Sequence, residues 1–559
     1  IPLIHNTDTI QAYIYVSPAD TTRARNSFIH LNQIFNAYID HWGSYKWERV
    51  GYVGVAFNNG AMEHATNIAY PEAAINGSLD NESLYGHELA HSWFGNLMTC
   101  ATAEDMWINE GWARYSEALY MGVLYPNSNA LLDGYKAQIR DLQYKTFRKA
   151  YSDDGGNFAL YPMPQNITYG TTTYDKGALI VHTLRNYLGD DKFFSSVRQV
   201  LQEFSFKAIN STQFCERLSY YSGIDLHDFF NAWIYQPGYL HFSIDSLVEN
   251  SNHNGEYTYY IHQKHSLGLN LGNSNRVEVT FFDQNWNCFT DTIHFSGETS
   301  SKSIILPFIP VLTAVDYNEK MADAIVDYNL RIKTTGNNSC ANAFASVNVV
   351  TLTDSAFIRV EHHWSAPDPL KSSSSAISRL SPNRYWKIDG IVPTYPFHAH
   401  VNFTYSNSLD MDGNLINNSA DSIIILYRSN AADDWTLIPF TKAGTSSGVI
   451  RIDTLLFGEY ALAIGDKNQI GIINHEHEKI TFEINPNPSK GIIQITSNNP
   501  NISYYQFIDT SGKVVLTINS ISPSTTVSTN QLRTGIYVVQ ATNKIGKILH
   551  SKKIIVAKN

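Results

Sequence analysis

Two histidines and a glutamate stand close together in the run His87-Glu88-Leu89-Ala90-His91. The run lies in segment 81–99, where apolar residues recur at spacings of three and four and predict a helix. Helical positions four residues apart share one face, so both imidazoles can reach one ion. Glu88 projects beside them, where it can accept a proton. Such an H-E-x-x-H run is typical of a zinc site, although the short pattern also arises by chance.

A third candidate ligand follows in the next predicted helix, 107–123. Eighteen residues separate His91 from Glu110, which stands in Asn109-Glu110-Gly111-Trp112-Ala113. Two histidines and one glutamate leave the fourth position of a tetrahedral zinc open, which is typical of a catalytic and not a structural ion. The same ligand set favours one Zn²⁺ over other metals. Packed core histidines with a surface carboxylate are the alternative interpretation.

Two further motifs flank this set. Gly60-Ala61-Met62-Glu63-His64 lies upstream, and Tyr174-Asp175-Lys176-Gly177 lies downstream. Together the motifs resemble those of the gluzincin zinc metallopeptidases, the family of aminopeptidase N and the leukotriene-A-type hydrolases. The first is similar to the family's G-x-M-E-N exopeptidase motif and the second to its Y-x-K-G segment. The resemblance extends to about residue 238, and it implies a thermolysin-like, mostly helical catalytic domain.

The resemblance also implies how catalysis would work. Zinc held by the three ligands would lower the pKa of a bound water and polarise the scissile carbonyl. Glu88 would be the general base that takes the proton of this water and passes it to the leaving amine. Tyr174 would donate a hydrogen bond to the oxyanion of the tetrahedral intermediate. A core tyrosine is the plain alternative for Tyr174.

Substrate binding is implied by the upstream motif. Glu63 would pair with the free α-ammonium of the substrate and so place the cut after its first residue. Backbone amides of Gly60 and Ala61 would support the substrate main chain. His64 departs from the family pattern, which usually has Asn, so it is either a residue that supports the substrate site or one with a structural role.

Composition changes near residue 238, from helical segments to short alternating runs separated by Asn, Gly, Ser and Pro. We therefore expect a multidomain α+β protein in which β-sandwich modules follow the helical catalytic domain. Family members carry a further β domain ahead of the catalytic domain, and only its last strand or so is expected here. The expected segments are an N-terminal β remnant at 1–20, the catalytic domain at 21–238, β modules at 239–335 and 336–466, a linker at 467–479, and a C-terminal module at 480–559.

The C-terminal module contains Asn485-Pro486-Asn487-Pro488, then Thr510-Ser511-Gly512-Lys513, and near its end Lys552-Lys553-Ile554-Ile555-Val556. Turn chemistry between short strands predicts a small Ig-like β-sandwich. The ordered set resembles the C-terminal sorting domain of the type IX secretion route. This resemblance implies a bacterial protein exported across the outer membrane, secreted or held at the cell surface, with the secretion machinery as a partner.

Charge and hydropathy narrow the function classes. The net charge of −11 and pI near 6.0 argue against a nucleic-acid binder. The sequence has no run of about 18 apolar residues that would mark a transmembrane segment. We expect a secreted zinc-dependent aminopeptidase acting on peptides. A zinc endopeptidase on the same scaffold, or a catalytically impaired surface-binding protein, are the alternatives.

Overall fold

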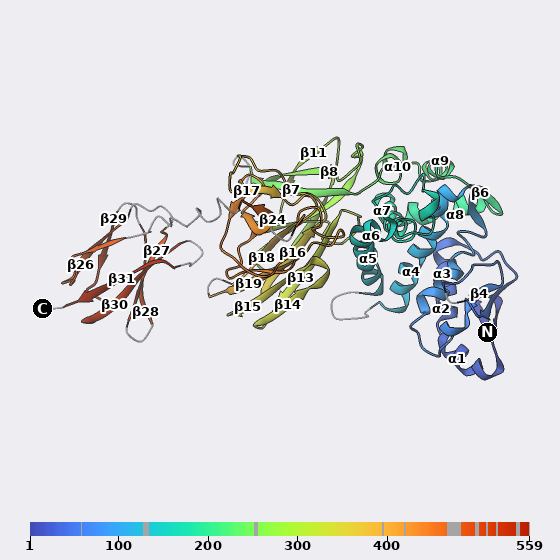
Figure 1. Ribbon diagram of the computed structural model, residues 1–559, viewed down its shortest axis with the longest axis horizontal. Coiled ribbons are helices and arrows are strands. Elements are labelled where there is room, and N and C mark those ends of the chain that lie inside the picture. The colour runs from blue at the N-terminus through green and yellow to red at the C-terminus, as the bar shows by residue number, and fades with distance from the viewer. Residues whose placement is uncertain are drawn as a thin grey trace. The chain divides into compact units, whose positions relative to one another are not determined.

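The computed structural model describes residues 1–57, 59–126, 133–250, 255–393, 396–418, 421–466, 482–497, 502–509, 513–520, 524–543 and 548–557. The chain divides into two compact units, 1–465 and 466–559. The linker predicted at 467–479 lies outside the described residues. In the first unit, helices precede a series of strands, coloured blue to teal and then green to orange in Figure 1. This order of helical and β-rich parts agrees with the predicted α+β class.

The chain opens with a four-stranded sheet in the order β1-β2-β3-β4. Its strands are β1 (Pro2–His5), β2 (Asp8–Tyr15), β3 (Arg49–Val55) and β4 (Ile68–Pro71). β2 and β3 are parallel, so a crossover must join them, and it contains helices α1 (Thr21–Ser27) and α2 (Leu31–Trp42). The boundary predicted at residue 20 therefore falls inside a sheet that both sides share.

Helix α3 (Glu82–Ala90) carries the histidine run, and it is shorter than predicted. His91 is its C-cap, and the chain then turns into strand β5 (Met98–Cys100). Gly95 in this turn has a φ of 126°, a conformation that suits glycine and cannot continue a helix. The helix predicted over 81–99 is thus wrong beyond residue 91. The turn sends the chain back toward a short 3₁₀ segment, η3 (Ala103–Ile108), and helix α4 (Glu110–Leu124).

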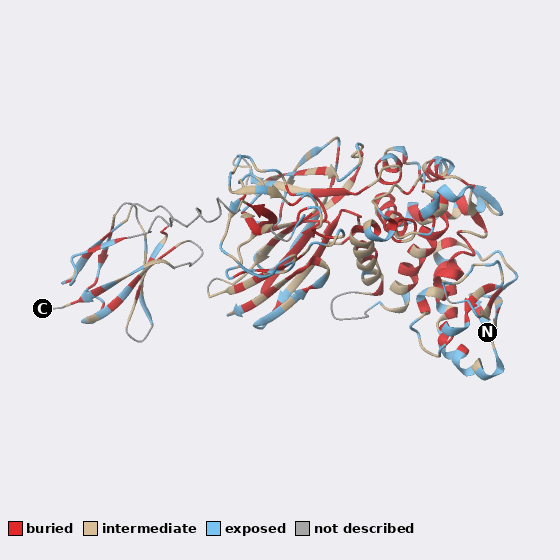
Figure 2. Cartoon of the chain, in the orientation of Figure 1, coloured by how far each residue is buried: buried red, intermediate tan, exposed pale blue. Residues whose placement is uncertain are grey.

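Helix α4 lies at the centre of the helical region, where it packs against α2, α3, α5 and α7. Most of its first three turns is buried, as the red colouring of α3 and α4 in Figure 2 shows. A π-helical turn, η6 (Thr172–Lys176), leads directly into α7 (Gly177–Leu188). The remaining elements of this region are α5 (Gly134–Tyr144), η4 (Lys145–Lys149), α6 (Ala150–Asp154), α8 (Asp190–Glu203), β6 (Lys207–Ile209), α9 (Ser211–Ser222) and α10 (His227–Trp233), with short 3₁₀ turns η1 (Pro18–Asp20), η2 (Glu72–Ala74) and η5 (Gln165–Ile167). None of the helices in the described ranges combines the length and apolar character needed to cross a membrane.

Four antiparallel sheets follow α10 within the first unit. Strand β13 pairs with β16, so the module boundary predicted at 335/336 separates two neighbours in one sheet. Two of the sheets have three strands each: β11-β8-β7, with β7 (Leu240–Glu249), β8 (Glu256–His265) and β11 (Thr299–Ile305), and β10-β9-β12, with β9 (Arg276–Phe282), β10 (Cys288–His294) and β12 (Leu312–Val315). The seven-stranded sheet consists of β13 (Ile325–Ile332), β16 (Ala356–His363), β17 (Ile377–Leu380), β18 (Tyr385–Ile391), β20 (Ser422–Arg428), β21 (Thr436–Leu437) and β24 (Gly458–Gly465). The fourth sheet has the order β14-β15-β19-β23-β22 and consists of β14 (Gly336–Cys340), which the 3₁₀ turn η7 (Ala341–Ala343) follows, β15 (Ala345–Thr351), β19 (His398–Ser406), β22 (Thr441–Gly444) and β23 (Ser447–Ile452).

The second unit consists of two sheets around a hydrophobic core of its own, which includes Phe507 and Val539. One sheet has β25 (Glu483–Asn485), β26 (Ile492–Thr496) and β29 (Ser524–Ser528), and the other has β27 (Tyr504–Ile508), β28 (Val514–Asn519), β30 (Gly535–Thr542) and β31 (Ile548–Val556). Thermolysin-like and β-sandwich architectures stay predictions for the helical and β-rich parts.

Separate cores predict that the second unit can be destabilised alone. Val539 is fully buried and its neighbour Val538 is 39% exposed on the same strand, which makes them a matched pair. We expect Val539→Ala to cost about 2 kcal/mol of unfolding free energy through lost burial and a cavity, and Val538→Ala to cost roughly 0.5 kcal/mol or less. Differential scanning calorimetry of the full chain should show only one transition moving. A joint shift of all transitions would contradict independent cores.

Candidate active site

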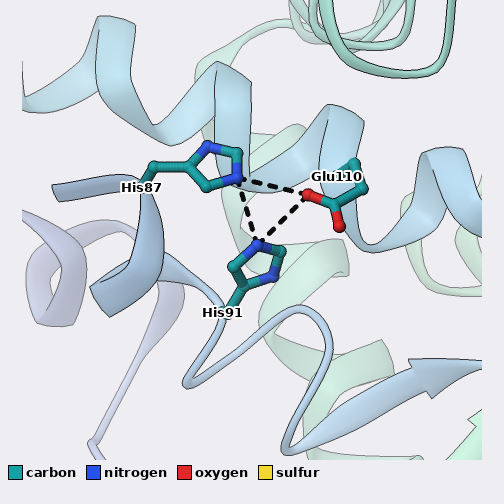
Figure 3. Close-up of side chains that lie close together, drawn as sticks. All are labelled: His87, His91 and Glu110. Carbon is teal, nitrogen blue, oxygen red and sulfur yellow. Dashed lines mark hydrogen bonds and ion pairs between the residues drawn. The ribbon is translucent and has the colours of Figure 1, made fainter. Parts of the chain in front are cut away.

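Three predicted ligands converge in a buried cluster (Figure 3). Nε2 of His87 lies 3.2 Å from Oε2 of Glu110 and 3.1 Å from Nε2 of His91, and His91 Nε2 lies 3.2 Å from the same Glu110 oxygen. Ligand atoms at zinc-binding distance from one tetrahedral ion are about 3.4 Å apart. The three side chains therefore fit a single Zn²⁺, with one nitrogen or oxygen ligand from each residue.

Second hydrogen bonds orient both imidazoles. Nδ1 of His91 donates to the carbonyl of Phe94 at 2.8 Å, and Nδ1 of His87 lies 3.0 Å from Oε1 of Glu117. A carbonyl or a carboxylate can only accept, so each Nδ1 carries a proton and each Nε2 is directed into the ligand cluster, where it can give its lone pair to a metal once it has lost its own proton. The turn after α3 is thus part of the site, because it supplies the carbonyl that orients His91.

Glu117 contacts one of the predicted zinc ligands, and the sequence motifs did not identify it. It is buried on α4, seven residues after Glu110, so two helical turns bring it to the same face. Burial by itself would raise the pKa of Glu117, but the charges and hydrogen bonds of Arg114 and His87 together outweigh it and hold this pKa below its usual range. Glu117 therefore remains a carboxylate that accepts the His87 proton. Its spacing from Glu110 was the available signal.

Burial and mutual charge also set the proton affinity of the ligands. Burial lowers the pKa of His87, yet its hydrogen bonds to Glu110 and Glu117 outweigh burial and raise that pKa to about 10. Burial alone would raise the pKa of Glu110, but the charges and hydrogen bonds of His91 and His87 hold it well below its usual range. A metal ion that binds here must therefore displace protons from the imidazoles.

A second group joins the predicted general base to the predicted amine-binding residue. Ligand atoms of Glu63, Glu88 and His91 lie within 4.8 Å of one another. Burial, together with the charges of Glu63 and Glu110, raises the pKa of Glu88, which is the direction that suits a general base. The side-chain amide of Asn96 donates to the carbonyl of Glu63 at 2.7 Å and so ties this segment to the turn after α3. Asn96 is a second residue that the motifs missed, since no spacing rule signals a side chain bonded to a distant backbone.

Tyr174 lies against the ligand cluster from the π-helical turn η6. Its ring stacks on His87 with centroids 5.8 Å apart and an interplanar angle of 30°. Burial, followed by the charge of Glu110, raises its pKa well above the usual range, so the phenol keeps its proton and can donate a hydrogen bond.

Two glycines allow η6 to approach α4 this closely. A Cβ on Gly111 would lie 2.9 Å from Cα of Gly177, and one on Gly177 would lie 3.0 Å from Cα of Gly111. Real Cβ atoms do not reach such distances, so the glycines of the N-E-G and K-G motifs face each other for a packing reason. Their contact sets the separation between Glu110, which precedes Gly111, and the turn that carries Tyr174.

The other predicted substrate-binding residues lie on the segment between β3 and β4. Gly60 is exposed with a φ of 98°, Ala61 is half-buried, and His64 is exposed. An isolated bridge between Met62 and Ala69 fixes this segment against β4. Gly60, Ala61 and His64 share the strand-like segment of Glu63 but lie outside both carboxylate–histidine clusters, so their roles stay predictions.

Two family models match the chain. Residues 27–233 match the peptidase family M1 domain, and residues 483–557 match the secretion system C-terminal sorting domain. The chain therefore carries a domain of the M1 zinc metallopeptidases, in which His87, His91 and Glu110 form a group that could hold the zinc ion, and a sorting domain at its C-terminus. The sorting domain indicates export by the type IX secretion route to the cell surface or beyond.

Individual relatives are similar over less than half of this chain. Glutamyl aminopeptidase of Bos taurus is 26% identical over 253 residues, 42% of this chain and 26% of the relative. Aminopeptidase N of Lactococcus lactis subsp. lactis is 27% identical over 254 residues, 43% of this chain and 28% of the relative. The chain thus spans little more than a quarter of the length of these curated relatives. Among solved structures, the M1 zinc metallopeptidase from Deinococcus radiodurans is 22% identical, with a TM-score of 0.35 over 42% of this chain and 50% of that one.

The contact between Glu117 and His87 predicts a measurable contribution to zinc affinity. We expect Glu117→Gln to weaken zinc binding about 10- to 100-fold, because a neutral amide orients the imidazole less firmly and does not raise its basicity. Glu203→Gln is the control, since Glu203 is a partly exposed carboxylate paired with Arg217. Competition with a chromogenic chelator measures both affinities. Equal affinities for the two variants would show that Glu117 has no such role.

Proposed function

We propose that this protein is a zinc-dependent aminopeptidase that hydrolyses the N-terminal peptide bond of peptides outside the cell. The observation that carries the proposal is the position of Glu63, whose carboxylate lies within 4.8 Å of both Glu88 and the zinc ligand His91. An anionic group beside the zinc-binding group suits a substrate whose free α-ammonium is one residue from the bond that is cut. The aminopeptidase names of the matched relatives agree with this proposal.

In the proposed hydrolysis, each step is carried out by a particular residue of this chain. Glu63 binds the α-ammonium and fixes the register of the peptide, while the backbone of Gly60 and Ala61 supports the main chain. Glu88 accepts the proton of the attacking water and returns it to the leaving amine. Tyr174 donates a hydrogen bond to the oxyanion that develops at the scissile carbonyl. Zinc at the site supplies a Lewis acid that acidifies water and polarises a carbonyl.

Peptides are the proposed substrates, and the type IX secretion machinery is the proposed partner of the C-terminal unit. His64 stands beside Glu63 in the amine-binding segment, so we propose that it influences which first residue is preferred. The proposals on peptide binding rest on the motif at residues 60–64, and the proposal of a secretion partner rests on the sorting domain at residues 483–557.

Free and blocked substrates separate the proposed activity from its alternatives. We expect chelator-sensitive cleavage of free aminoacyl amides and no cleavage of their N-acetylated counterparts, because acetylation removes the charge that Glu63 binds. A fluorogenic assay with and without a zinc chelator measures this. Equal cleavage of blocked peptides would favour an endopeptidase, and no cleavage of either would favour a binding protein.

The charge of Glu63 predicts a specific loss. We expect Glu63→Gln to lower kcat/KM for free aminoacyl amides by roughly 100-fold, the order of effect of removing one partner from a close charge pair. Glu72→Gln serves as the control, since Glu72 is exposed in the 3₁₀ turn after β4. Steady-state kinetics of both variants, with zinc content checked, provides the measurement. An unchanged kcat/KM in Glu63→Gln would remove Glu63 from amine recognition.

The general base can be separated from the metal site. We expect Glu88→Gln to lower kcat by about 100- to 10,000-fold, since an amide cannot accept the proton. Zinc stoichiometry should stay at the wild-type value, because Glu88 is not one of the three ligands. Metal analysis by mass spectrometry beside single-turnover kinetics tests both parts. Loss of zinc together with activity would show that Glu88 serves the metal site instead.

A further inference from the structure

Arg114 occupies a position that none of the recognised motifs includes. It lies on α4, one turn after Glu110, and its side chain is 14% exposed. Its guanidinium contacts three carboxylates: Nε donates to Asp175 at 3.0 Å, Nη1 to Glu117 at 2.5 Å, and Nη2 to Asp141 at 3.1 Å. A planar guanidinium fork can hold several carboxylates in fixed directions, which an ammonium cannot do.

The contact with Glu117 leads to the predicted zinc ligands. Glu117 uses both of its oxygens: Oε2 accepts from Arg114 and Oε1 faces Nδ1 of His87 at 3.0 Å. Because both oxygens are engaged, Arg114 fixes the plane of the Glu117 carboxylate. The carboxylate in turn fixes the orientation of the His87 imidazole. Arg114 thus reaches His87 through a single intervening side chain.

The contact with Asp175 leads to the residue proposed to bind the oxyanion. Asp175 directly follows Tyr174 in the π-helical turn η6, and it is largely buried. A π-helical turn is an uncommon conformation, frequently found at functional sites. The bond from Arg114 pins this turn to α4 beside the close approach of Gly111 and Gly177.

We propose that Arg114 is a positioning residue that fixes the zinc ligand His87, through Glu117, relative to Tyr174, through Asp175. Part of this proposal rests on the proposed function, namely the role of Tyr174 in turnover. The plain alternative is an ion pair that only stabilises the packing of α4 on α5, with Asp141 as its useful partner. The two interpretations differ in what happens to zinc affinity and to kcat.

The experiment compares Arg114→Met, which removes the fork, with Arg114→Lys, which keeps the charge. Arg185→Met is the matched control, because Arg185 is similarly buried, at 19% exposure, and binds Asp190 and Tyr115 away from the ligand cluster. We expect Arg114→Met to weaken zinc binding in a chelator competition about 10- to 100-fold, and Arg114→Lys to restore part of the loss. At saturating zinc, kcat should fall about 10-fold or more while KM changes less than threefold.

Two further variants separate the arms of the network. Asp175→Asn should lower kcat and leave zinc affinity within twofold, and it keeps the proposal testable if Arg114→Met does not fold. In a Tyr174→Phe background, Arg114→Met should lower kcat less than threefold further, because the group that it positions is gone.

The proposal is overturned if Arg114→Met changes zinc affinity and kcat no more than Arg185→Met does, at a similar loss of melting temperature. Full additivity with Tyr174→Phe would overturn the Tyr174 arm. If the wild-type protein cleaves no peptide, the proposed function fails, and the zinc affinities of Arg114→Met and Arg185→Met alone decide the His87 arm.

Discussion

The site depends on keeping carboxylates and imidazoles together where little water reaches them. Glu110 and Glu117 are both more than nine-tenths buried, as are His87 and His91. An isolated buried charge costs several kcal/mol, so such a cluster persists only when each charge has a partner of the opposite sign or a metal. Two positive groups fit this need, the Arg114 guanidinium on one side and a zinc ion on the other. This requirement explains why α4 contributes three charged residues within two turns: the predicted ligand Glu110, the carboxylate Glu117 that contacts His87, and the cation Arg114.

Rigid packing must hold these partners in place, and large aromatic side chains supply it. Trp112, two residues after Glu110, is fully buried and stacks on Phe94 and Phe193 with centroids 4.8 Å and 5.7 Å apart. Phe94 is also the residue whose carbonyl orients His91. The same contacts therefore fix α4 against the turn after α3, so packing and ligand orientation are not separable. The glycine pair Gly111 and Gly177 completes the arrangement, because the missing side chains let η6 pack closely against α4.

Local spacing predicted the part of the site that lies on single helices. His87 and His91 are one turn apart on α3, and the helix that starts at Glu110 could be anticipated from its apolar spacing. Arg114 could not be assigned a role in this way, because its partner Asp175 lies 61 positions along the chain. The end of α3 at Ala90 was also missed, since the apolar spacing of 92–99 continues to resemble a helix, although Gly95 has a φ of 126° that no helix contains. The domain boundaries at 20 and 335 stay predictions, but strands on either side of each one pair in a shared sheet, β2 with β3 and β13 with β16, and such long-range pairing cannot be predicted from local spacing.

Helix α5 connects the site network to the sheets that follow. Asp141 accepts from Arg114, while its neighbour Arg140 donates to Glu319 at 2.7 Å and lies 3.6 Å from Asp327 on β13. Consecutive helical residues point about 100° apart, so one helix can present its two faces to two structures. The contacts of Arg140 with the buried carboxylates of Glu319 and Asp327 fix the orientation of α5 on the sheets. The sheets of 240–465 are consequently part of the framework that holds α5, and through Asp141 they bear on the guanidinium that orients Glu117. A hydrophobic core that continues from the helical region into these sheets joins them in one compact unit, whereas the sorting domain has a core of its own.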